Sequence, residues 1–280
     1  MKAETGVRKV VVLCEIRNSG MKIIDNSLLS AFRNAVDFDP MVALSEKSTE
    51  QLPVDYFRFY HAVSSVYSSK IEGEEVDFDS YFKYKFMEVK YQPDYTMRAD
   101  DLFRAYEYIL QNPLTKAHLL EAHRILSQHL LPKSQRGLIR TNPMFVLNEA
   151  DRIEYVACAP EQVPAAIALF FEDLEVLRSA DMEPLEVFYY AAMLHLVFVK
   201  IHPMQDGNGR TARLLEKWFL LEKLGNRALS IESEKNCYVN RQAYYHNIRK
   251  LGLDYESLDY GQALDFLLMT VDSLRRDREL

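Results

Sequence analysis

Cysteine, glycine and proline are all scarce in this chain of 280 residues, which contains 3 Cys, 9 Gly and 10 Pro. An odd number of cysteines without a Cys-x-x-Cys pair argues against a disulfide framework and against a thiolate zinc site. So few glycines and prolines exclude collagen and argue against long linkers or disordered tracts. The sequence therefore favours a globular protein with reduced thiols, and we expect it in the cytoplasm.

Positive charge is also in short supply. Lys and Arg number 34 against 41 Asp and Glu, which gives a formal net charge of -7. Proteins that bind nucleic acids hold the phosphates with clustered Lys and Arg. Nucleic acid is therefore not the expected partner, although a local basic site is compatible with this balance.

Long uninterrupted apolar runs are missing as well. The run at 10–14 is short and is followed at once by Glu15, so it does not resemble a signal peptide. The longest apolar stretch, 185–201, is interrupted by a glutamate, a histidine and a lysine. It is too short and too polar to predict a membrane span, so we expect a soluble chain with no membrane partner.

Helical periodicity dominates what the sequence does contain. Apolar residues recur at helical spacing in segments that Gly, Pro or capping residues delimit. These segments are about 26–36, 55–71, 99–111, 115–131, 161–178, 184–200, 208–223, 240–250 and 257–276.

Residues 137–157 break this pattern. Two short β-prone runs flank a polar turn at 148–152, which predicts a hairpin or a long flap. We therefore predict an all-α fold with one β-hairpin at about 137–157. Residues 1–50 are expected to form an N-terminal segment of unknown role, and residues 51–280 a helical domain.

The segment 202–213 places an imidazole between two predicted helices. It contains the sequence His-Pro-Met-Gln-Asp-Gly-Asn-Gly-Arg-Thr-Ala-Arg. Pro203 biases the residue before it away from helical geometry, so His202 should lie where a helix passes into a loop. A histidine before proline is by itself only a turn signal, and the residues that follow make it specific.

Those following residues have the composition of an anion site. The two glycines flank an asparagine where the next helix begins, and free N–H groups at a helix start attract phosphate. The two arginines lie three positions apart, so both guanidiniums can reach one polyphosphate. Asp206, just before the loop, is a carboxylate suited to holding Mg²⁺ beside the same phosphates. The candidates for phosphate binding are Gly207, Asn208, Gly209, Arg210 and Arg213.

Two other interpretations fit the sequence less well. The run from Gly207 to Ala212 formally matches the dinucleotide fingerprint, but that fingerprint follows a strand in a βαβ unit, and no such alternation is present. A zinc hydrolase with an HExxH motif needs histidines at i and i+4. The histidines that it would use are five and six positions apart, and with the intervening glutamate they are His118, Glu121, His123 and His129.

The segment 202–213 resembles the signature of the Fic family, His-Pro-Phe-x-(Asp/Glu)-Gly-Asn-Gly-Arg-x-x-Arg. Every specified position matches except Met204, where the family usually has Phe; methionine is also an apolar plug, so we expect only a packing change. The resemblance covers about residues 55–270. Its weaker parts are Leu119 to Leu126, similar to a Leu-x-x-x-His helix, 137–140 with the β-prone runs, similar to a target-docking flap, and Tyr244 and Tyr245, similar to a tyrosine pair near the nucleotide base.

The resemblance implies transfer of a nucleoside monophosphate, usually AMP from ATP, to a Ser, Thr or Tyr hydroxyl of a protein. It implies that His202 takes the hydroxyl proton and that Asp206 holds Mg²⁺ between the α- and β-phosphates. The backbone and asparagine side chain of the glycine loop would stabilise charge on the α-phosphate, Arg210 would hold the β-phosphate and Arg213 the γ-phosphate. The kinase-like Doc toxins carry Ala and Lys in this loop, so the two glycines and Arg210 favour nucleotidyl transfer.

Upstream, Ser68-Ser-Lys-Ile-Glu72-Gly73 resembles the inhibitory helix of the family, (Ser/Thr)-x-x-x-Glu-(Gly/Asn). A Ser and a Glu four positions apart are common at helix ends, but together with the main motif they predict an inhibitory helix at about 55–73. The resemblance implies that Glu72 pairs with Arg213 in place of the γ-phosphate. Ser68 is expected to fix the Glu72 side chain by a hydrogen bond.

The function expected from these features is a self-inhibited protein adenylyltransferase that modifies a target protein and itself. Two alternatives stay open: a hydrolase in which Glu72 positions water to remove AMP, and a nucleotide-sensing adaptor whose flap captures a partner strand without catalysis. The expected ligands are ATP, Mg²⁺ and an unidentified target protein that docks on the flap. Homo-oligomerisation is left open.

Overall fold

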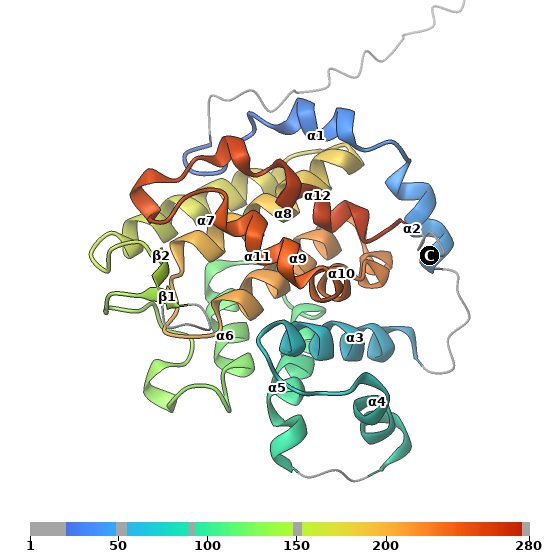
Figure 1. Cartoon of the computed structure of the whole chain (residues 1–280). Helices are drawn as coiled ribbons and strands as arrows, with labels where there is room; N and C mark the ends of the chain where they lie inside the picture. Colours follow the sequence, from blue (N-terminus) through green and yellow to red (C-terminus); the bar gives the residue numbers. More distant parts are fainter. Residues whose placement is uncertain (1–20, 49–54, 90–92, 148–152, 276–280) are drawn as a thin grey trace, which may run out of the picture.

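Two long helices form the centre of the computed structural model, which describes residues 21–48, 55–89, 93–147 and 153–275 (Figure 1). They are α8 (Pro184–Ile201) and α9 (Asn208–Leu224). Around them lie α1 (Leu29–Ala35), α2 (Pro40–Ser48), α3 (Tyr56–Ile71), α4 (Phe78–Met87), α5 (Pro93–Ile109), α6 (Lys116–Leu126), α7 (Val163–Ser179), α10 (Ser233–Val239), α11 (Arg241–Arg249) and α12 (Leu264–Asp272). The predicted all-α fold with one hairpin is confirmed.

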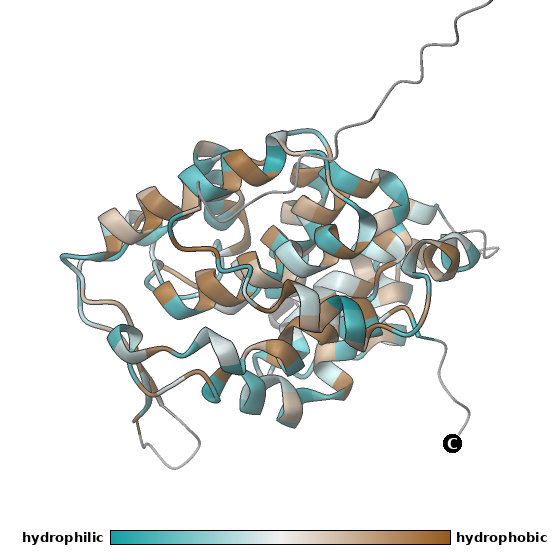
Figure 2. Ribbon diagram, turned by 90° about the horizontal axis from the view of Figure 1, so that it is seen from above, coloured by the Kyte–Doolittle hydropathy of each residue, from teal (hydrophilic) through white to brown (hydrophobic). Residues whose placement is uncertain are grey.

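The apolar composition of α8 follows from its central position. Nearly the whole helix is buried, and Glu183 and Glu186 form a capping box that fixes where it starts. Among the described residues, α8 is the one helix long and apolar enough to cross a membrane by length and composition, and 78% of it is buried inside the fold. Most surrounding helices carry both hydrophilic and hydrophobic residues, as amphipathic helices around a core do (Figure 2).

Three helices were missed by the periodicity argument: α2, α4 and α10. Helix α4 alternates aromatic residues with lysines, which reads equally as a strand, but Asp77 caps its first turn by accepting the N–H of Ser80 at 2.9 Å. The predicted helix at 257–276 is shorter, because residues 255–262 form two 3₁₀ turns. Asp254 and Asp259 cap these turns and end any continuous helix.

The described part of the N-terminal segment packs on the same core as the helical domain. Both oxygens of the Asp173 carboxylate accept backbone N–H groups of residues 22–24 at 2.7–2.9 Å. Phe32 of α1 and Leu44 of α2 are fully buried. Residues 1–20, with the apolar run at 10–14, lie outside the described residues.

The hairpin lies at one end of the molecule and is tied to the central loop (Figure 1). Strand β1 (Phe145–Leu147) pairs antiparallel with β2 (Ile153–Val156), and the predicted turn at 148–152 lies outside the described residues. The far edge of β2 is covered, because the N–H of Val156 donates to the carbonyl of Leu253 at 2.8 Å. Toward the centre, Ile139 forms a bridge with Met204 of the loop between α8 and α9.

Candidate active site

His202 ends α8 in an unusual backbone conformation. Its φ of 54° lies in the left-handed region, which residues other than glycine rarely adopt. Its Nδ1 lies 3.1 Å from the carbonyl oxygen of Val199, so Nδ1 carries the proton and Nε2 keeps a lone pair. Burial lowers the pKa of His202 to about 4. The imidazole is therefore neutral near pH 7, as a general base has to be.

This lowered pKa predicts an unusually flat acid limb in the pH profile. An ordinary histidine, with a pKa near ~6.5, would lose about tenfold of its neutral form at pH ~5.5. The expected reaction is nucleotidyl transfer. We expect its kcat/KM, measured in the Glu72→Gly variant at that pH, to stay within about twofold of the value near neutral pH. Circular dichroism at both pH values controls for unfolding. A tenfold fall without unfolding contradicts the lowered pKa of His202.

Arg140 holds the backbone on which His202 stands. Its guanidinium is buried, and it donates from Nε to the carbonyl of His202 at 2.6 Å, from Nη1 to Asn142 at 2.7 Å and from Nη2 to Cys158 at 2.5 Å. Its own N–H donates to the carbonyl of Pro203 at 2.9 Å. One side chain therefore ties the base of the flap to the loop between α8 and α9.

Asn208 shapes the loop from inside. Its side-chain oxygen accepts the N–H of Met204 at 2.8 Å, and its amide donates to the Met204 carbonyl at 2.9 Å. Both polar ends of the Asn208 side chain thus hold the Met204 backbone, and its contact with a phosphate stays a prediction. Met204 itself is 1% exposed, in keeping with its expected packing role.

His123 of α6 supports the same loop from below. Its Nδ1 accepts the N–H of Gly137 at 2.8 Å, so its Nε2 carries the proton and donates to the carbonyl of Asp206 at 3.0 Å. Burial lowers the pKa of His123, which keeps this neutral form. Gly207 has a φ of 77°, and a Cβ there would lie 3.2 Å from Leu130, so glycine is required at this turn.

Glu72, at the end of α3, reaches the second arginine of the motif. Its Oε1 accepts from Arg213 Nη2 at 2.6 Å. Burial acts to raise the pKa of Glu72, but Arg213 and Arg210 outweigh it, so the pKa is lowered and the carboxylate is charged. A Cβ on Gly209 would lie 2.6 Å from the same carboxylate oxygen. The absence of a side chain at Gly209 thus leaves room for a negatively charged group beside the first turn of α9.

Ser68 has a different partner from the one predicted. Its hydroxyl accepts from Arg213 Nε at 2.9 Å, and its carbonyl accepts from Arg213 Nη2 at 3.1 Å. Ser68 therefore orients the arginine instead of the Glu72 side chain. Because residue 68 lies one helical turn before residue 72, both face the same guanidinium.

A second glutamate, not singled out in the sequence, occupies the first arginine. Glu74 Oε1 accepts from Arg210 Nη2 at 2.5 Å and also lies 3.4 Å from Arg98 Nη1 of α5. The Arg210 side chain is 6% exposed, and its buried Nε has no hydrogen-bond partner among the described residues. Both arginines of the segment 202–213 are thus paired with carboxylates from the segment that follows α3.

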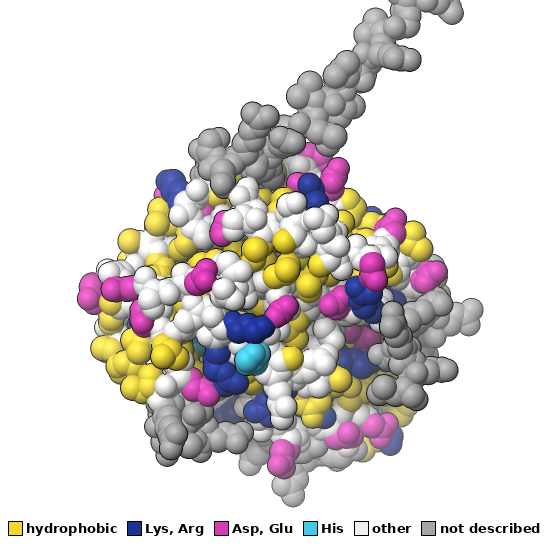
Figure 3. Space-filling model, turned by 45° about the horizontal axis from the view of Figure 1, so that its top comes forward, with side chains coloured by type: hydrophobic (Ala, Val, Ile, Leu, Met, Phe, Trp, Pro, Cys, Tyr) yellow, Lys and Arg dark blue, Asp and Glu magenta, His cyan; other side chains and the backbone are white. Residues whose placement is uncertain are grey.

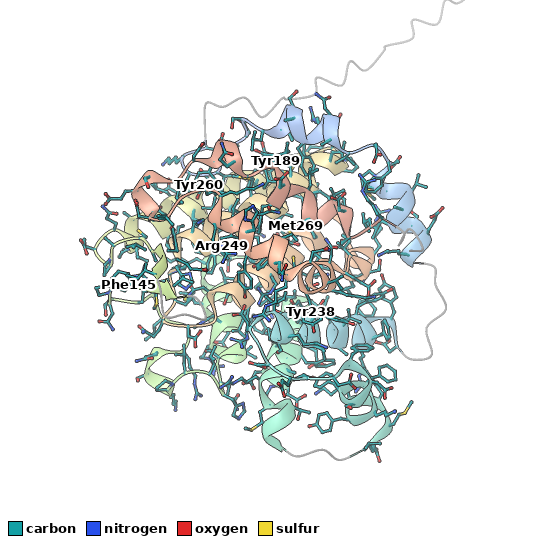
Figure 4. The ribbon with its side chains drawn as sticks, in the orientation of Figure 1. Phe145, Tyr189, Tyr238, Arg249, Tyr260 and Met269 are labelled. Carbon is teal, nitrogen blue, oxygen red and sulfur yellow. The ribbon has the colours of Figure 1, made fainter. Side chains whose placement is uncertain are left out.

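A cavity of about 1380 Å³ opens beside these residues. Its wall contains Glu72, His202, Gly209 and Arg213, and it extends past α11 to the hairpin. Phe145 on the hairpin, Arg249 and Tyr238, all cavity-lining residues, lie across one face of the molecule from the hairpin to α3 (Figure 4). In another view, Lys and Arg side chains gather with a histidine near the middle of the face (Figure 3).

The predicted tyrosine pair lies in this wall, but its two members differ. Tyr244 is 1% exposed, and its hydroxyl lies 3.2 Å from Arg213 Nη1. Tyr245 is partly buried and donates to the carbonyl of Ile71 at 3.1 Å. Tyr245 thereby ties α11 to the end of α3, and its role near a nucleotide base stays a prediction.

Asp206 is exposed at the start of the loop, with one carboxylate oxygen accepting the N–H of Gly207 at 2.6 Å. The described residues contain no cluster of three or more side chains that would hold a metal ion by themselves. A single carboxylate fits Mg²⁺ that arrives bound to phosphates, because Mg²⁺ commonly keeps several waters and takes only one or two protein carboxylates.

The histidines of the zinc alternative do not converge. His118 contacts the carbonyl of Pro113, His123 contacts the carbonyl of Asp206, and His129 pairs with Asp101. Glu121 pairs with Arg124. Each has a separate structural partner, so they do not form a metal centre. The dinucleotide alternative also fails, because the described residues have no parallel sheet and the glycine loop follows a helix.

Comparisons with known proteins agree with this geometry. Residues 113–220 match the model of the Fic/DOC family. The chain is similar to "Protein adenylyltransferase Fic" of Nematostella vectensis, 35% identical over 108 residues, which is 39% of this chain and 23% of the relative. It is also similar to the protein of that name from Drosophila ananassae, 31% identical over 136 residues, or 49% of this chain and 24% of the relative. The chain thus spans about a quarter of the length of these curated relatives.

Solved structures show the same fold. A Fic family protein from Desulfovibrio desulfuricans superposes with a TM-score of 0.70 at 17% identity, covering 90% of this chain and 74% of that one. A Fic domain containing signaling protein from Bacteroides thetaiotaomicron gives 0.61 at 21% identity, covering 84% and 94%. Residues 113–220 are thus similar to the Fic/DOC family, in keeping with the resemblance of the sequence signature.

Proposed function

We propose that the chain is a self-inhibited protein adenylyltransferase that transfers AMP from ATP to a protein hydroxyl. One observation carries the proposal. The neutral imidazole of His202, whose Nε2 has no hydrogen bond among the described residues, lines the same cavity as Arg213, which is paired with a carboxylate that a phosphate could displace. The names of the curated relatives support the reaction class. Because the chain spans about a quarter of their length, its substrates and partners are inferred from its own residues.

In the proposed reaction, His202 Nε2 accepts the proton of the target hydroxyl as its oxygen bonds to the α-phosphorus of ATP. The bond from that phosphorus to the β-phosphate oxygen breaks, and pyrophosphate leaves. Backbone N–H groups at the start of α9 face the charge that develops on the α-phosphate. Arg210 is proposed to hold the β-phosphate and Arg213 the γ-phosphate, and Asp206 would hold the Mg²⁺ that neutralises phosphate charge.

The flap is proposed to place the target. Strand β2 is paired on both edges, with β1 and with Leu253, whereas β1 has no second neighbouring strand among the described residues. Phe145 and Ile153 on the hairpin are 49% and 57% exposed. An extended target segment that adds to β1 would bring its hydroxyl along the cavity wall toward His202.

Intact-mass spectrometry after incubation with Mg²⁺ and each of the four nucleoside triphosphates tests the reaction. We expect the Glu72→Gly variant to gain one AMP with ATP, and the Glu72→Gly, His202→Ala variant to gain nothing. The absence of any adduct on the chain and on proteins of a bacterial lysate contradicts the proposal. Incubating an adenylylated protein with the wild-type chain separates transfer from AMP removal.

Self-inhibition is proposed to rest on two carboxylates. Glu72 occupies Arg213, and Glu74 occupies Arg210, so neither guanidinium is free for a triphosphate. Both contacts are ion pairs between an arginine and a glutamate. Glu74 also pairs with Arg98, so Arg210 shares its carboxylate partner with a second arginine.

The Glu74 contact predicts a second, smaller activation step. In the Glu72→Gly background, Glu74→Gln should raise the rate of self-modification about fivefold, since it removes a charge-assisted hydrogen bond worth about 1 kcal/mol in net terms. The measurement is the initial rate of radiolabel incorporation from ATP. The exposed neighbour provides the control, since Glu75→Gln should leave the rate unchanged. Equal rates for the two substitutions would remove Glu74 from the inhibitory mechanism.

A further inference from the structure

The Arg213 guanidinium is held from two sides. From α3, the Ser68 hydroxyl and carbonyl and the Glu72 carboxylate accept three of its hydrogen bonds. From α11, the Tyr244 hydroxyl accepts a hydrogen bond from Nη1 at 3.2 Å. The contacts from Ser68 and Glu72 belong to the proposed inhibitory helix. When a triphosphate takes the place of the Glu72 carboxylate, the contact from Tyr244 can therefore remain.

Tyr244 is itself fixed by a buried chain of hydrogen bonds. Its oxygen lies 3.0 Å from His195 Nε2, and His195 Nδ1 lies 2.6 Å from Glu216 Oε2. Arg213 can only donate, so the Tyr244 oxygen accepts from it. With His195 neutral, Tyr244 gives its own proton to His195 Nε2. His195 then carries its proton on Nδ1 and donates it to Glu216. Every group in the chain therefore has one consistent role.

The chain of hydrogen bonds belongs to the rigid part of the fold. His195 is on α8, Glu216 on α9 and Tyr244 on α11, and each side chain is at most 2% exposed. Phe266 of α12 packs edge-on against His195 and tilted against Tyr244, with ring centroids 5.1 Å and 5.8 Å away. Displacement of α3 would leave these contacts in place.

We propose that Tyr244 is a positioning residue that aims Arg213 at the γ-phosphate and so makes the site prefer ATP to ADP. This rests on the proposed function, in which Arg213 binds the γ-phosphate. Tyr244 acts through the arginine and does not touch the reacting atoms. ADP lacks the γ-phosphate, so its affinity should not depend on the Tyr244 hydroxyl.

Calorimetric titration of Mg²⁺-ATP and Mg²⁺-ADP into the Glu72→Gly, His202→Ala chain tests this. The first substitution frees the site and the second prevents turnover, so binding can be read even if the mass-spectrometric test finds no AMP transfer. Adding Tyr244→Phe should weaken ATP about tenfold, the effect of one hydrogen bond to a charged group, and leave ADP unchanged.

Two comparisons separate positioning from a general structural effect. Arg213→Ala should lose the preference for ATP. Adding Tyr244→Phe to the Arg213→Ala chain should cause no further loss of ATP affinity. Tyr189→Phe removes another buried hydroxyl, which donates to the carbonyl of Asp25 at 2.9 Å, and should leave both affinities unchanged. Equal losses for ATP and ADP, no loss, or additive losses with Arg213→Ala overturn the proposal.

A second pair of variants guards against misfolding of Tyr244→Phe. His195→Gln keeps a hydrogen-bond acceptor for the Tyr244 hydroxyl and should retain the preference for ATP. His195→Leu removes the acceptor and should lose it. The same behaviour of both His195 variants contradicts the proposed chain of hydrogen bonds.

Discussion

Replacing Glu72 by glycine should raise the initial rate of self-modification about thirtyfold. The carboxylate lies 2.6 Å from Arg213 Nη2, with the arginine side chain 2% exposed and the glutamate side chain 28% exposed. Two charges at ~4 Å with an effective dielectric constant of ~20 attract by about 4 kcal/mol, and partial exposure halves this to about 2 kcal/mol. That free energy corresponds to about thirtyfold in site occupancy.

The measurement is label transferred from ATP to the chain at low ATP concentration, where occupancy limits the rate. Adding His202→Ala should abolish the signal, because the hydroxyl proton then has no acceptor. Glu75→Gly, a neighbouring exposed position, provides the matched control. A Glu72→Gly rate equal to that of the wild type would refute inhibition by the Glu72 carboxylate.

Replacing Arg140 by lysine should cost both stability and activity. The guanidinium donates to the carbonyls of Asn142, Cys158 and His202, and a single ammonium cannot reach all three. The loss of buried charge-assisted hydrogen bonds should lower the free energy of unfolding by about 3 kcal/mol. For a chain of this size, that corresponds to a fall in Tm of roughly 6–12 °C.

The activity effect of Arg140→Lys should exceed what unfolding explains. With its carbonyl released, His202 can leave the left-handed conformation, and a displacement of ~1 Å at a catalytic group costs about a hundredfold in rate. Differential scanning fluorimetry and label transfer, both in the Glu72→Gly background, measure the two effects. Arg136→Lys is the control, because Arg136 donates to a single carbonyl, that of Leu131. A normal rate below the reduced Tm would contradict the positioning role.

Local patterns predicted the centre of this fold and of its site. The apolar stripe of α8, the proline after His202 and the glycine loop before α9 are signals within about thirty neighbouring residues. They act over single turns of helix, so the sequence displays them directly. The contact between Glu72 and Arg213 was also anticipated, but only through the resemblance to a known signature.

Contacts between distant segments were missed for a physical reason. Glu74 and Arg210 are 136 positions apart, and nothing in either segment shows that the turn after α3 brings them together. The predicted hydrogen-bond partner of Ser68 was Glu72, because the two residues lie one helical turn apart in the sequence. The sequence does not show that Arg213 contacts both side chains. Arg140 lies in residues 137–140, which resemble part of the Fic flap. Its role depends on the carbonyls of Asn142, Cys158 and His202, which only the tertiary fold brings together.

The tethering of Glu72 and Glu74 to α3 has a consequence for how the proposed activity would be switched on. Because these competitors are covalently part of the molecule, their effective concentration is set by the fold and does not fall when the protein is diluted. Dilution of the protein therefore does not relieve the proposed inhibition, and nucleotide competes with carboxylates whose effective concentration stays constant. Any event that pulls one helix end aside would liberate two guanidiniums at once.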